Sequence, residues 1–166
     1  VNLNLAPVLD VNNNPNNPVI GERSFGAEPE LVAKMGAAYI KGLQSEGIIA
    51  AAKHFPGHGD TVTDSHTALP VINHSRARLD AVELYPFKKA IEVGVEVIMA
   101  AHIYFPAIET EAGIPATLSK AVLTDLLREE LDFRGLIITD DMEIGAITKN
   151  FGTVQGAVRS IKAGSD

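Results

Sequence analysis

The stretch from Gly47 to Asp60, GIIAAAKHFPGHGD, contains the pattern that decides the fold. Its first half is a continuous apolar run that ends at the Lys53-His54 pair, and its second half is rich in Gly and Pro. A short apolar run without alternation is typical of a strand buried on both faces, as in a parallel sheet. The stretch therefore predicts a buried parallel strand that ends in polar residues and leads into a loop.

The same pattern recurs along the chain. Other apolar segments run from Val1 to Asp10, from Glu96 to Ala101 and from Leu136 to Asp140. Between the apolar segments, and after the last, helical spacing predicts helices over 28–47, over 75–94 in two pieces divided at Pro86, over 120–131 and over 153–162. Strands that alternate with helices predict a parallel α/β sheet covered by helices.

Four such units are too few to close an eight-stranded barrel, which needs about 250 residues. We expect residues 1–166 to form a portion, about half, of a TIM-type (β/α)₈ barrel that is truncated at both ends. An open parallel α/β sheet is the alternative. If the barrel is incomplete, the isolated chain is expected to have little or no enzymatic turnover.

The composition excludes several classes of protein. The net charge of −7 provides no basic field to attract nucleic acid, and the absence of cysteine removes disulfides, thiolate metal sites and a cysteine nucleophile. The longest apolar runs fall far below the roughly 18 residues of a membrane-spanning helix. The compartment stays open between the bacterial cytoplasm and secretion to the cell wall, because a signal sequence could precede Val1.

Polar residues stand where each predicted strand ends. They are Asp10, the pair Lys53-His54, His102 and Asp140. In barrels and open α/β sheets alike, ligands bind at the carboxyl ends of the strands. A single polar residue at the end of a strand is common and needs no function, but polar residues at four strand ends together predict a ligand-binding site.

The loop after Lys53 holds three of the five histidines. His54 and His58 have the spacing of helical zinc ligands and His66 could be a third, but the surrounding Gly and Pro remove the helix on which that spacing depends. No metal and no cofactor are predicted. Ser65 lies directly between Asp64 and His66, and adjacent residues cannot fold into a Ser-His-Asp relay.

Asp64 and His66 make better sense as a pair. A carboxylate two residues away can bind one imidazole nitrogen and raise the basicity of the other, although a local hydrogen bond that stiffens the turn explains the pattern equally well. Asp140, followed by Asp141, is suited either to attack an electrophilic centre or to cap the next segment. Spacing alone does not decide between these alternatives.

Several motifs in order resemble glycoside hydrolase family 3, in its bacterial β-N-acetylglucosaminidase branch. The motifs are NPVIGERSFG (17–26), KHFPGHGDTVTDSHTALP (53–70), ELYPFKKAI (83–91), PATLS (115–119) and FRGLIITDDMEIGAI (133–147). The resemblance covers nearly the whole chain and implies that residues 1–166 are part of the family's N-terminal barrel domain.

The resemblance also implies an activity and a set of site residues. The activity is retaining hydrolysis of a terminal β-linked N-acetylglucosamine, from muropeptides or chitin oligosaccharides, through a covalent glycosyl-enzyme. Asp140 matches the nucleophile, and His66, polarised by Asp64, matches the general acid/base. Arg23 and the pair Lys53-His54 match residues that bind the sugar.

The sequence departs from the family pattern in places, and alternatives remain. An upstream aspartate that grips the sugar is absent, and Ile144 stands where the family often has Met. A β-glucosidase or a phosphorylase of the same family and a non-catalytic sugar-binding fragment are the alternatives. Among the other polar residues, His58 and Asp60 are interpreted as shaping the loop, His102 as lining the pocket and His74 as structural.

Overall fold

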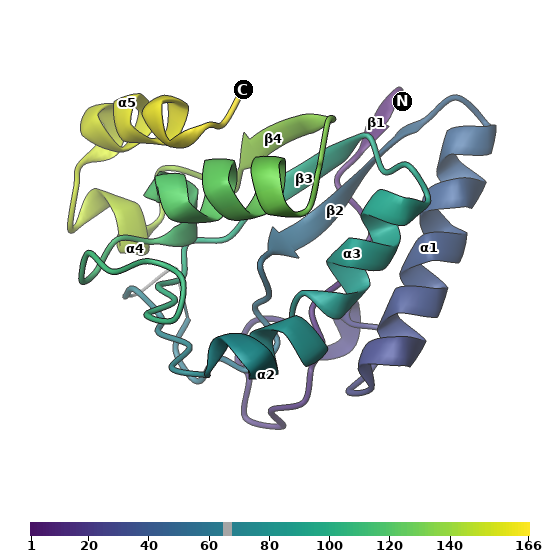
Figure 1. The fold of residues 1–166 in the computed structure, drawn as a ribbon, viewed down its shortest axis with the longest axis horizontal. Coiled ribbons are helices and arrows are strands. Elements are labelled where there is room, and N and C mark those ends of the chain that lie inside the picture. The colour runs from purple at the N-terminus through teal and green to yellow at the C-terminus, as the bar shows by residue number, and fades with distance from the viewer. Residues whose placement is uncertain (65–67) are drawn as a thin grey trace.

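The computed structural model describes residues 1–64 and 68–166, and these form an α/β fold around a parallel sheet (Figure 1). Four parallel strands lie in the order β1-β2-β3-β4, and the sheet of the described residues is open. The strands are β1 (Leu3–Asn4), β2 (Ile49–Phe55), β3 (Val97–Ala100) and β4 (Leu136–Thr139). The predicted parallel sheet, in chain order, is therefore confirmed.

Helices connect the strands and cover the sheet. In Figure 1, α1, α3 and η3 lie on the same side of the strands, as the outer helices of a barrel do, and not on two opposite faces. The helical elements are η1 (Gly21–Arg23), α1 (Pro29–Ser45), α2 (Arg76–Ala81), α3 (Tyr85–Glu92), η2 (Ala116–Leu118), the π-helical η3 (Ala121–Glu130), α4 (Gly145–Thr148) and α5 (Thr153–Ala163). This arrangement agrees with a portion of a barrel. No helix in the described part of the chain combines the length and apolar character needed to cross a membrane.

The first predicted strand is shorter than expected. Only Leu3–Asn4 pair regularly with β2, although backbone hydrogen bonds continue from Ala51 N to Ala6 O, 3.0 Å, and from Lys53 N to Pro7 O, 3.1 Å. Pro7 has no N–H to donate, so a regular ladder cannot continue through it. The segment still follows β2 as far as Leu9, whose N–H donates to Lys53 O at 2.6 Å.

Proline and glycine set the helix ends much as predicted. Pro29 lies in the first turn of α1, and Gly47, which has φ +72°, follows the end of that helix. Pro86 lies in the first turn of α3, so the predicted division of 75–94 into two helices is confirmed, with the break just before the proline.

The hydrophobic core lies between the sheet and its helices. Ala50, Ala51 and Ala52 of β2 are fully buried. Phe55, at the end of β2, packs edge-to-face against Phe87 of α3 with ring centroids 5.3 Å apart. This core fixes β2, whose last residues enter the polar site described below.

Gly59 allows the loop after β2 to lie directly against the segment that follows Pro7. A Cβ atom at this position would be 1.9 Å from the carbonyl oxygen of Val11. No side chain fits there, because real Cβ contacts with backbone oxygens are more than 1 Å longer. The loop therefore depends on Gly59 to hold its position.

Gly59→Ala is expected to destabilise the full-length protein by about 2 kcal/mol or more, because either the loop or the Val11 backbone must move. Gly42→Ala is the control, since a Cβ atom there meets nothing within 4 Å. In the interior of α1 that change should be neutral or stabilising by up to about 1 kcal/mol. Urea unfolding of both variants makes the comparison, and equal midpoints would contradict the close approach at Gly59.

Candidate active site

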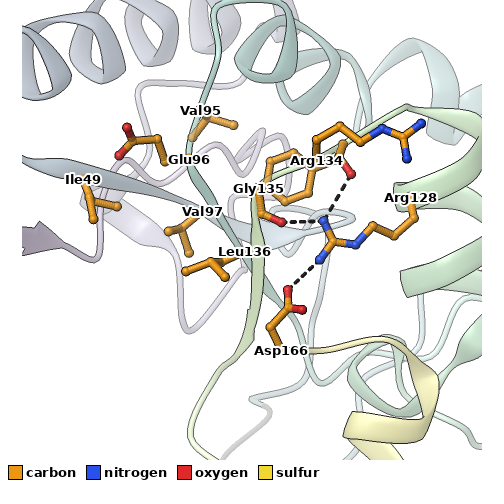
Figure 2. Close-up of a pocket in the computed structure, with 10 residues that line it drawn as sticks. Ile49, Val95, Glu96, Val97, Arg128, Arg134, Gly135, Leu136 and Asp166 are labelled. Atoms are coloured by element: carbon orange, nitrogen blue, oxygen red, sulfur yellow. Dashed lines mark hydrogen bonds and ion pairs between the residues drawn. The ribbon is translucent and has the colours of Figure 1, made fainter.

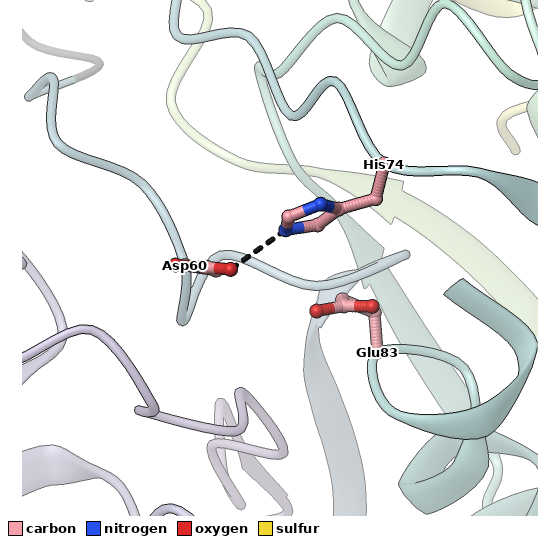
Figure 3. A group of neighbouring side chains, drawn as sticks. All are labelled: Asp60, His74 and Glu83. Atoms are coloured by element: carbon pink, nitrogen blue, oxygen red, sulfur yellow. Dashed lines mark hydrogen bonds and ion pairs between the residues drawn. The ribbon is translucent and has the colours of Figure 1, made fainter. Parts of the chain in front are cut away.

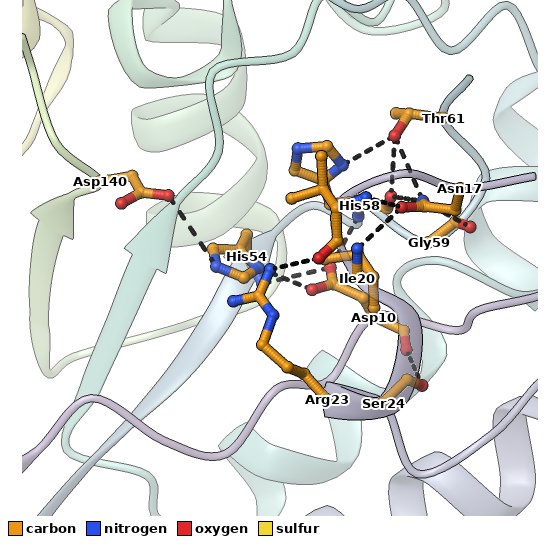
Figure 4. Close-up of polar contacts among 11 residues, drawn as sticks. Asp10, Asn17, Ile20, Arg23, Ser24, His54, His58, Gly59, Thr61 and Asp140 are labelled. Carbon is orange, nitrogen blue, oxygen red and sulfur yellow. Dashed lines mark hydrogen bonds and ion pairs between the residues drawn. The ribbon is translucent and has the colours of Figure 1, made fainter. Parts of the chain in front are cut away.

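The polar residues predicted at the strand ends lie at the carboxyl end of the sheet, several of them in contact (Figure 4). Lys53 and His54 are near the end of strand β2, His102 follows β3 and Asp140 follows β4. His54 Nε2 is 3.9 Å from Asp140 Oδ2, which joins two strand ends that are not adjacent in the sheet. Asp10 completes the group from the segment beside β2.

Asp10 is a fully buried carboxylate with three hydrogen bonds from the β2 loop (Figure 4). Its Oδ1 accepts from the backbone N–H of His54 at 3.2 Å and of His58 at 2.7 Å, and its Oδ2 is 2.7 Å from His54 Nδ1. Burial acts to raise the pKa of Asp10, but the electrostatic and hydrogen-bond interactions with His54 and His58 together outweigh burial and lower it. Asp10 is therefore an ionised anchor for the loop.

His54 and His58 have different surroundings although they share this anchor. The β2 ladder is irregular between Lys53 and Phe55, where the Lys53–His54 peptide bond is cis, and the buried His54 ring points toward Asp140. The His58 ring is buried, and its Nδ1 lies 2.9 Å from Thr61 Oγ1. Burial lowers the pKa of His58, against the opposing charge of Asp10. His58 thus belongs to the packing of the loop, as expected from the sequence.

Asn17 secures the same loop from the motif that precedes α1. Its Nδ2 donates to the carbonyl oxygens of His58 at 2.8 Å and Gly59 at 3.0 Å, while its Oδ1 accepts from the N–H groups of Val19 and Ile20. A single amide side chain therefore ties residues 17–20 to residues 58–59. Because Arg23 follows directly in η1, this bond also helps to place the predicted sugar-binding arginine.

Arg23 and Lys53 lie close enough to influence each other electrostatically. Both line a hollow of about 320 Å³ beside the segment Leu5–Val8. Burial, and then the charge of Arg23, lowers the pKa of Lys53, whereas Asp140 and Asp10 act in the opposite direction. Arg23 is exposed, and its Nη2 donates to Val19 O at 3.0 Å. The two cations therefore lie beside the same hollow.

The two adjacent aspartates differ in their contacts. Asp140 has a side chain that is 39% exposed; its Oδ1 accepts from Asp141 N at 2.8 Å and its Oδ2 faces His54. Asp141 Oδ1 accepts from Glu143 N at 2.8 Å, which is the local turn-capping contact that the sequence left possible for either residue. Asp140 thus directs a carboxylate oxygen toward His54, while a carboxylate oxygen of Asp141 caps the following turn.

His102 contacts the backbone of the turn that contains Asp140 and Asp141. It is buried, and burial lowers the pKa of its ring, so the ring is neutral. Its Nε2 lies 3.0 Å from the carbonyl oxygen of Asp141, and its Nδ1 lies 2.7 Å from Thr117 Oγ1. A carbonyl can only accept, so the hydrogen of the neutral ring is on Nε2. The Thr117 hydroxyl lies within hydrogen-bond distance of both Nδ1 and Ala101 O, and its single hydrogen serves one of them at a time. His102 holds the backbone beside Asp140.

The predicted acid/base pair is described only in part. His66 lies outside the described residues, together with Ser65 and Thr67. Asp64 is half-buried, and its carbonyl oxygen accepts from Ala68 N at 3.2 Å. The roles of Asp64 and His66 therefore stay predictions.

A second polar cluster lies beside this loop and consists of Asp60, His74 and Glu83 (Figure 3). Each offers a donor atom within 4.8 Å of the others, the one such metal-compatible group in residues 1–64 and 68–166. His74 Nε2 is 2.7 Å from Asp60 Oδ2. The Arg78 guanidinium lies 3.3 Å from Glu83 Oε1 and 3.8 Å from Asp60 Oδ2.

The Arg78 guanidinium already supplies a positive charge to that cluster. Glu83 is almost fully buried, and neither of its oxygens has a hydrogen bond of good geometry within residues 1–64 and 68–166, although the ion pair with Arg78 is close. Burial raises the pKa of Glu83, against the charge of Arg78. Asp60 and His74 connect the two ends of segment 61–73, which agrees with the loop-shaping and structural roles expected of them.

A hollow also lies at the opposite end of the strands (Figure 2). Its volume is about 710 Å³, and it is lined by residues at the amino ends of β2, β3 and β4, including Ile49, Val97 and Leu136. Arg128 crosses it, donating to backbone oxygens of Phe133 and Gly135 and to Asp166. In barrels this end of the sheet contributes to stability and the carboxyl end to catalysis, so the polar strand-end group is the better candidate.

Sequence reasoning placed Asp10 at a strand end but missed its contact with His54. The signal was available in principle, because Asp10 and His54 both end segments predicted to be neighbouring parallel strands. The contact between His102 and the Asp141 carbonyl had no such signal, since it depends on a turn.

Comparisons with known proteins agree on one family. The family described as "Glycosyl hydrolase family 3 N terminal domain" matches residues 1–166. Beta-hexosaminidase A of Pseudoalteromonas piscicida is 41% identical over 176 residues, covering 100% of this chain and 29% of that protein. Beta-hexosaminidase of Nitrosomonas eutropha is 39% identical, covering 99% of this chain and 46% of that protein.

A solved structure matches the fold over the whole chain. It is a glycoside hydrolase family 3 beta-N-acetylglucosaminidase from Paenibacillus sp. str. FPU-7, with a TM-score of 0.98, 53% identity, and coverage of 100% of this chain and 31% of that one. The chain thus spans less than half the length of each of these three proteins. A family match over the complete chain and identities of 39% or more lead to one conclusion: the chain belongs to glycoside hydrolase family 3.

Proposed function

We propose that the protein containing this chain is a retaining exo-β-N-acetylglucosaminidase that removes terminal β-linked N-acetylglucosamine from muropeptides or chitin oligosaccharides. The observation that carries the proposal is the Asp140 carboxylate, partly exposed and 3.9 Å from His54, at the carboxyl end of a parallel sheet. The relatives named beta-hexosaminidase and beta-N-acetylglucosaminidase support this choice of sugar.

Asp140 has the features of a nucleophile. Its Oδ1 is held by the N–H of Asp141, so the side chain is oriented, and Oδ2 is directed toward the site. In the first step, Asp140 attacks the anomeric carbon while the bond to the leaving oxygen breaks, and His66 gives its proton to that oxygen. In the second, water attacks the same carbon, loses a proton to His66 and displaces Asp140.

Three cationic or imidazole side chains are suited to bind the sugar. Arg23 and Lys53 line one hollow, and the His54 ring faces Asp140. A pyranose ring presents several hydroxyl groups, and binding it in one orientation requires several fixed donors and acceptors. The proposed general acid, His66 with Asp64 two residues before it, would act from the adjoining loop.

The choice of substrate is tested by the rate of nitrophenol release from an N-acetylglucosaminide and from a glucoside, each with and without phosphate. We expect a kcat/KM for the N-acetylglucosaminide at least about 10-fold higher, with no acceleration by phosphate, because water is the proposed acceptor. A preference for the glucoside, or sugar phosphate as the main product, would instead identify the alternative activities in the family.

Asp140→Asn is expected to lower kcat by about 10³-fold or more, because an amide cannot form the glycosyl ester. A fluorinated glycoside that traps the intermediate should label Asp140 in the wild-type protein, as mapped by peptide mass spectrometry. Asp141→Asn is the matched control and should retain labelling at residue 140. Labelling of any other residue would refute the assignment.

His66→Ala is expected to slow hydrolysis by about 10²- to 10⁴-fold for substrates with poor leaving groups, and much less for those with good ones. Only a poor leaving group needs a proton as its bond breaks. His74→Ala provides the control, because it removes a histidine from the same region and should affect both substrates equally. Comparing kcat/KM across a series of aryl glycosides gives the result; a flat dependence for His66→Ala would exclude it as the acid.

A further inference from the structure

The contacts of the buried Asp10 carboxylate both fix the loop after β2 and orient the imidazole ring of His54. Asp10 divides its two carboxylate oxygens between two tasks (Figure 4). Oδ1 receives the backbone N–H groups of His54 and His58, and Oδ2 receives the His54 ring. The bonds to Oδ1 fix the loop, so the contact at Oδ2 is the one that acts on the imidazole.

That contact determines where the ring hydrogen of His54 lies. Asp10 is fully buried, with three hydrogen-bond contacts, two of them from backbone N–H groups. An ionised carboxylate can only accept, so Nδ1 of His54 must be the donor across the 2.7 Å contact. In the neutral ring, Nε2 then has no hydrogen and presents a lone pair.

The bare nitrogen faces the site. Nε2 lies on the side of Asp140, 3.9 Å from its Oδ2, which is too far for a hydrogen bond between them. With its ring hydrogen on Nδ1, His54 donates no hydrogen bond to the Asp140 carboxylate. A sugar hydroxyl that reaches Nε2 can donate its one hydrogen there.

We propose that Asp10 is a positioning residue of this site: its carboxylate fixes the His54 ring and keeps the ring hydrogen on Nδ1, so that Nε2 accepts a hydrogen bond from the bound sugar. The proposal rests on the glycosidase function proposed above. Asp10 itself touches no substrate, because it is fully buried behind His54.

Asp10→Asn separates the two tasks. The amide oxygen can keep both backbone contacts of Oδ1, whereas the NH₂ group takes the place of Oδ2 and donates to Nδ1. The ring hydrogen of neutral His54 must then move to Nε2, which becomes a donor toward Asp140. We expect kcat/KM per competent site to fall by about 10- to 100-fold, with a higher KM and a lower kcat, because the sugar loses an acceptor and the nucleophile gains a donor.

The experiment has two readouts, both on the full-length protein. Long-range ¹H–¹⁵N correlation of ¹⁵N-histidine-labelled protein reports which ring nitrogen of His54 carries hydrogen, with the signals assigned through His54→Gln. Titration with a trapping glycoside counts competent sites, so that a loss of folded protein is not read as a loss of rate. Ser45→Ala is the control, since it removes a hydroxyl contact with Gly42 O at the end of α1, just before the amino end of β2, and should leave both readouts unchanged.

The proposal is supported if the wild-type ring carries hydrogen on Nδ1 alone and Asp10→Asn reverses this with the expected loss of rate. It is overturned if the wild-type ring carries hydrogen on Nε2 throughout the active pH range, or if the reversed ring leaves kcat/KM per site unchanged. Should Asp10→Asn fail to fold, the wild-type spectrum alone still decides the position of the hydrogen. Absence of glycoside turnover in the wild type would defeat the proposed function, while the spectrum would still report on Asp10 and His54.

Discussion

The site depends on a charge buried where a parallel sheet ends. Asp10 is out of contact with water, and it is tolerated there because two backbone N–H groups and one imidazole surround its oxygens. These partners come from the loop that follows β2. The carboxylate thus joins the first segment of the chain to that loop, and the direction of the His54 ring follows from the bond.

Packing on the helix side makes this polar end possible. Phe55 and Phe87 form an edge-to-face pair directly behind the loop, and the alanines of β2 are fully buried. Small and aromatic residues therefore hold the end of β2 in place, while Gly59 lets the loop lie against Val11. The same strands have an apolar hollow at their amino ends, so the sheet separates a region suited to stability from one suited to chemistry.

The sequence was sufficient for the features that arise from local pattern. Apolar runs located β2, β3 and β4, and Pro86 located the break between α2 and α3. The length of β1 was overestimated, because the alternation of residues 1–10 is visible in sequence but the interruption of the ladder at Pro7 requires knowing which N–H groups face β2. Because ligands bind at the carboxyl ends of parallel strands, the sequence predicted that His54 and Asp140 lie at one site. It could not predict the side-chain contacts of Asp10 or His102, which depend on the exact path of the backbone.

The contact between Asp60 and His74 has a consequence for how such a site diversifies. These residues are joined at 2.7 Å on either side of segment 61–73. The ends of that segment are also held, because Thr61 Oγ1 lies 2.9 Å from His58 Nδ1 and Ile72 N donates to Tyr104 O at 3.0 Å. A chain closed at its base tolerates insertion well: each doubling of its length costs only about 0.6 kcal/mol in closure entropy. A change of length between these held ends would therefore leave the carboxyl end of the sheet in place.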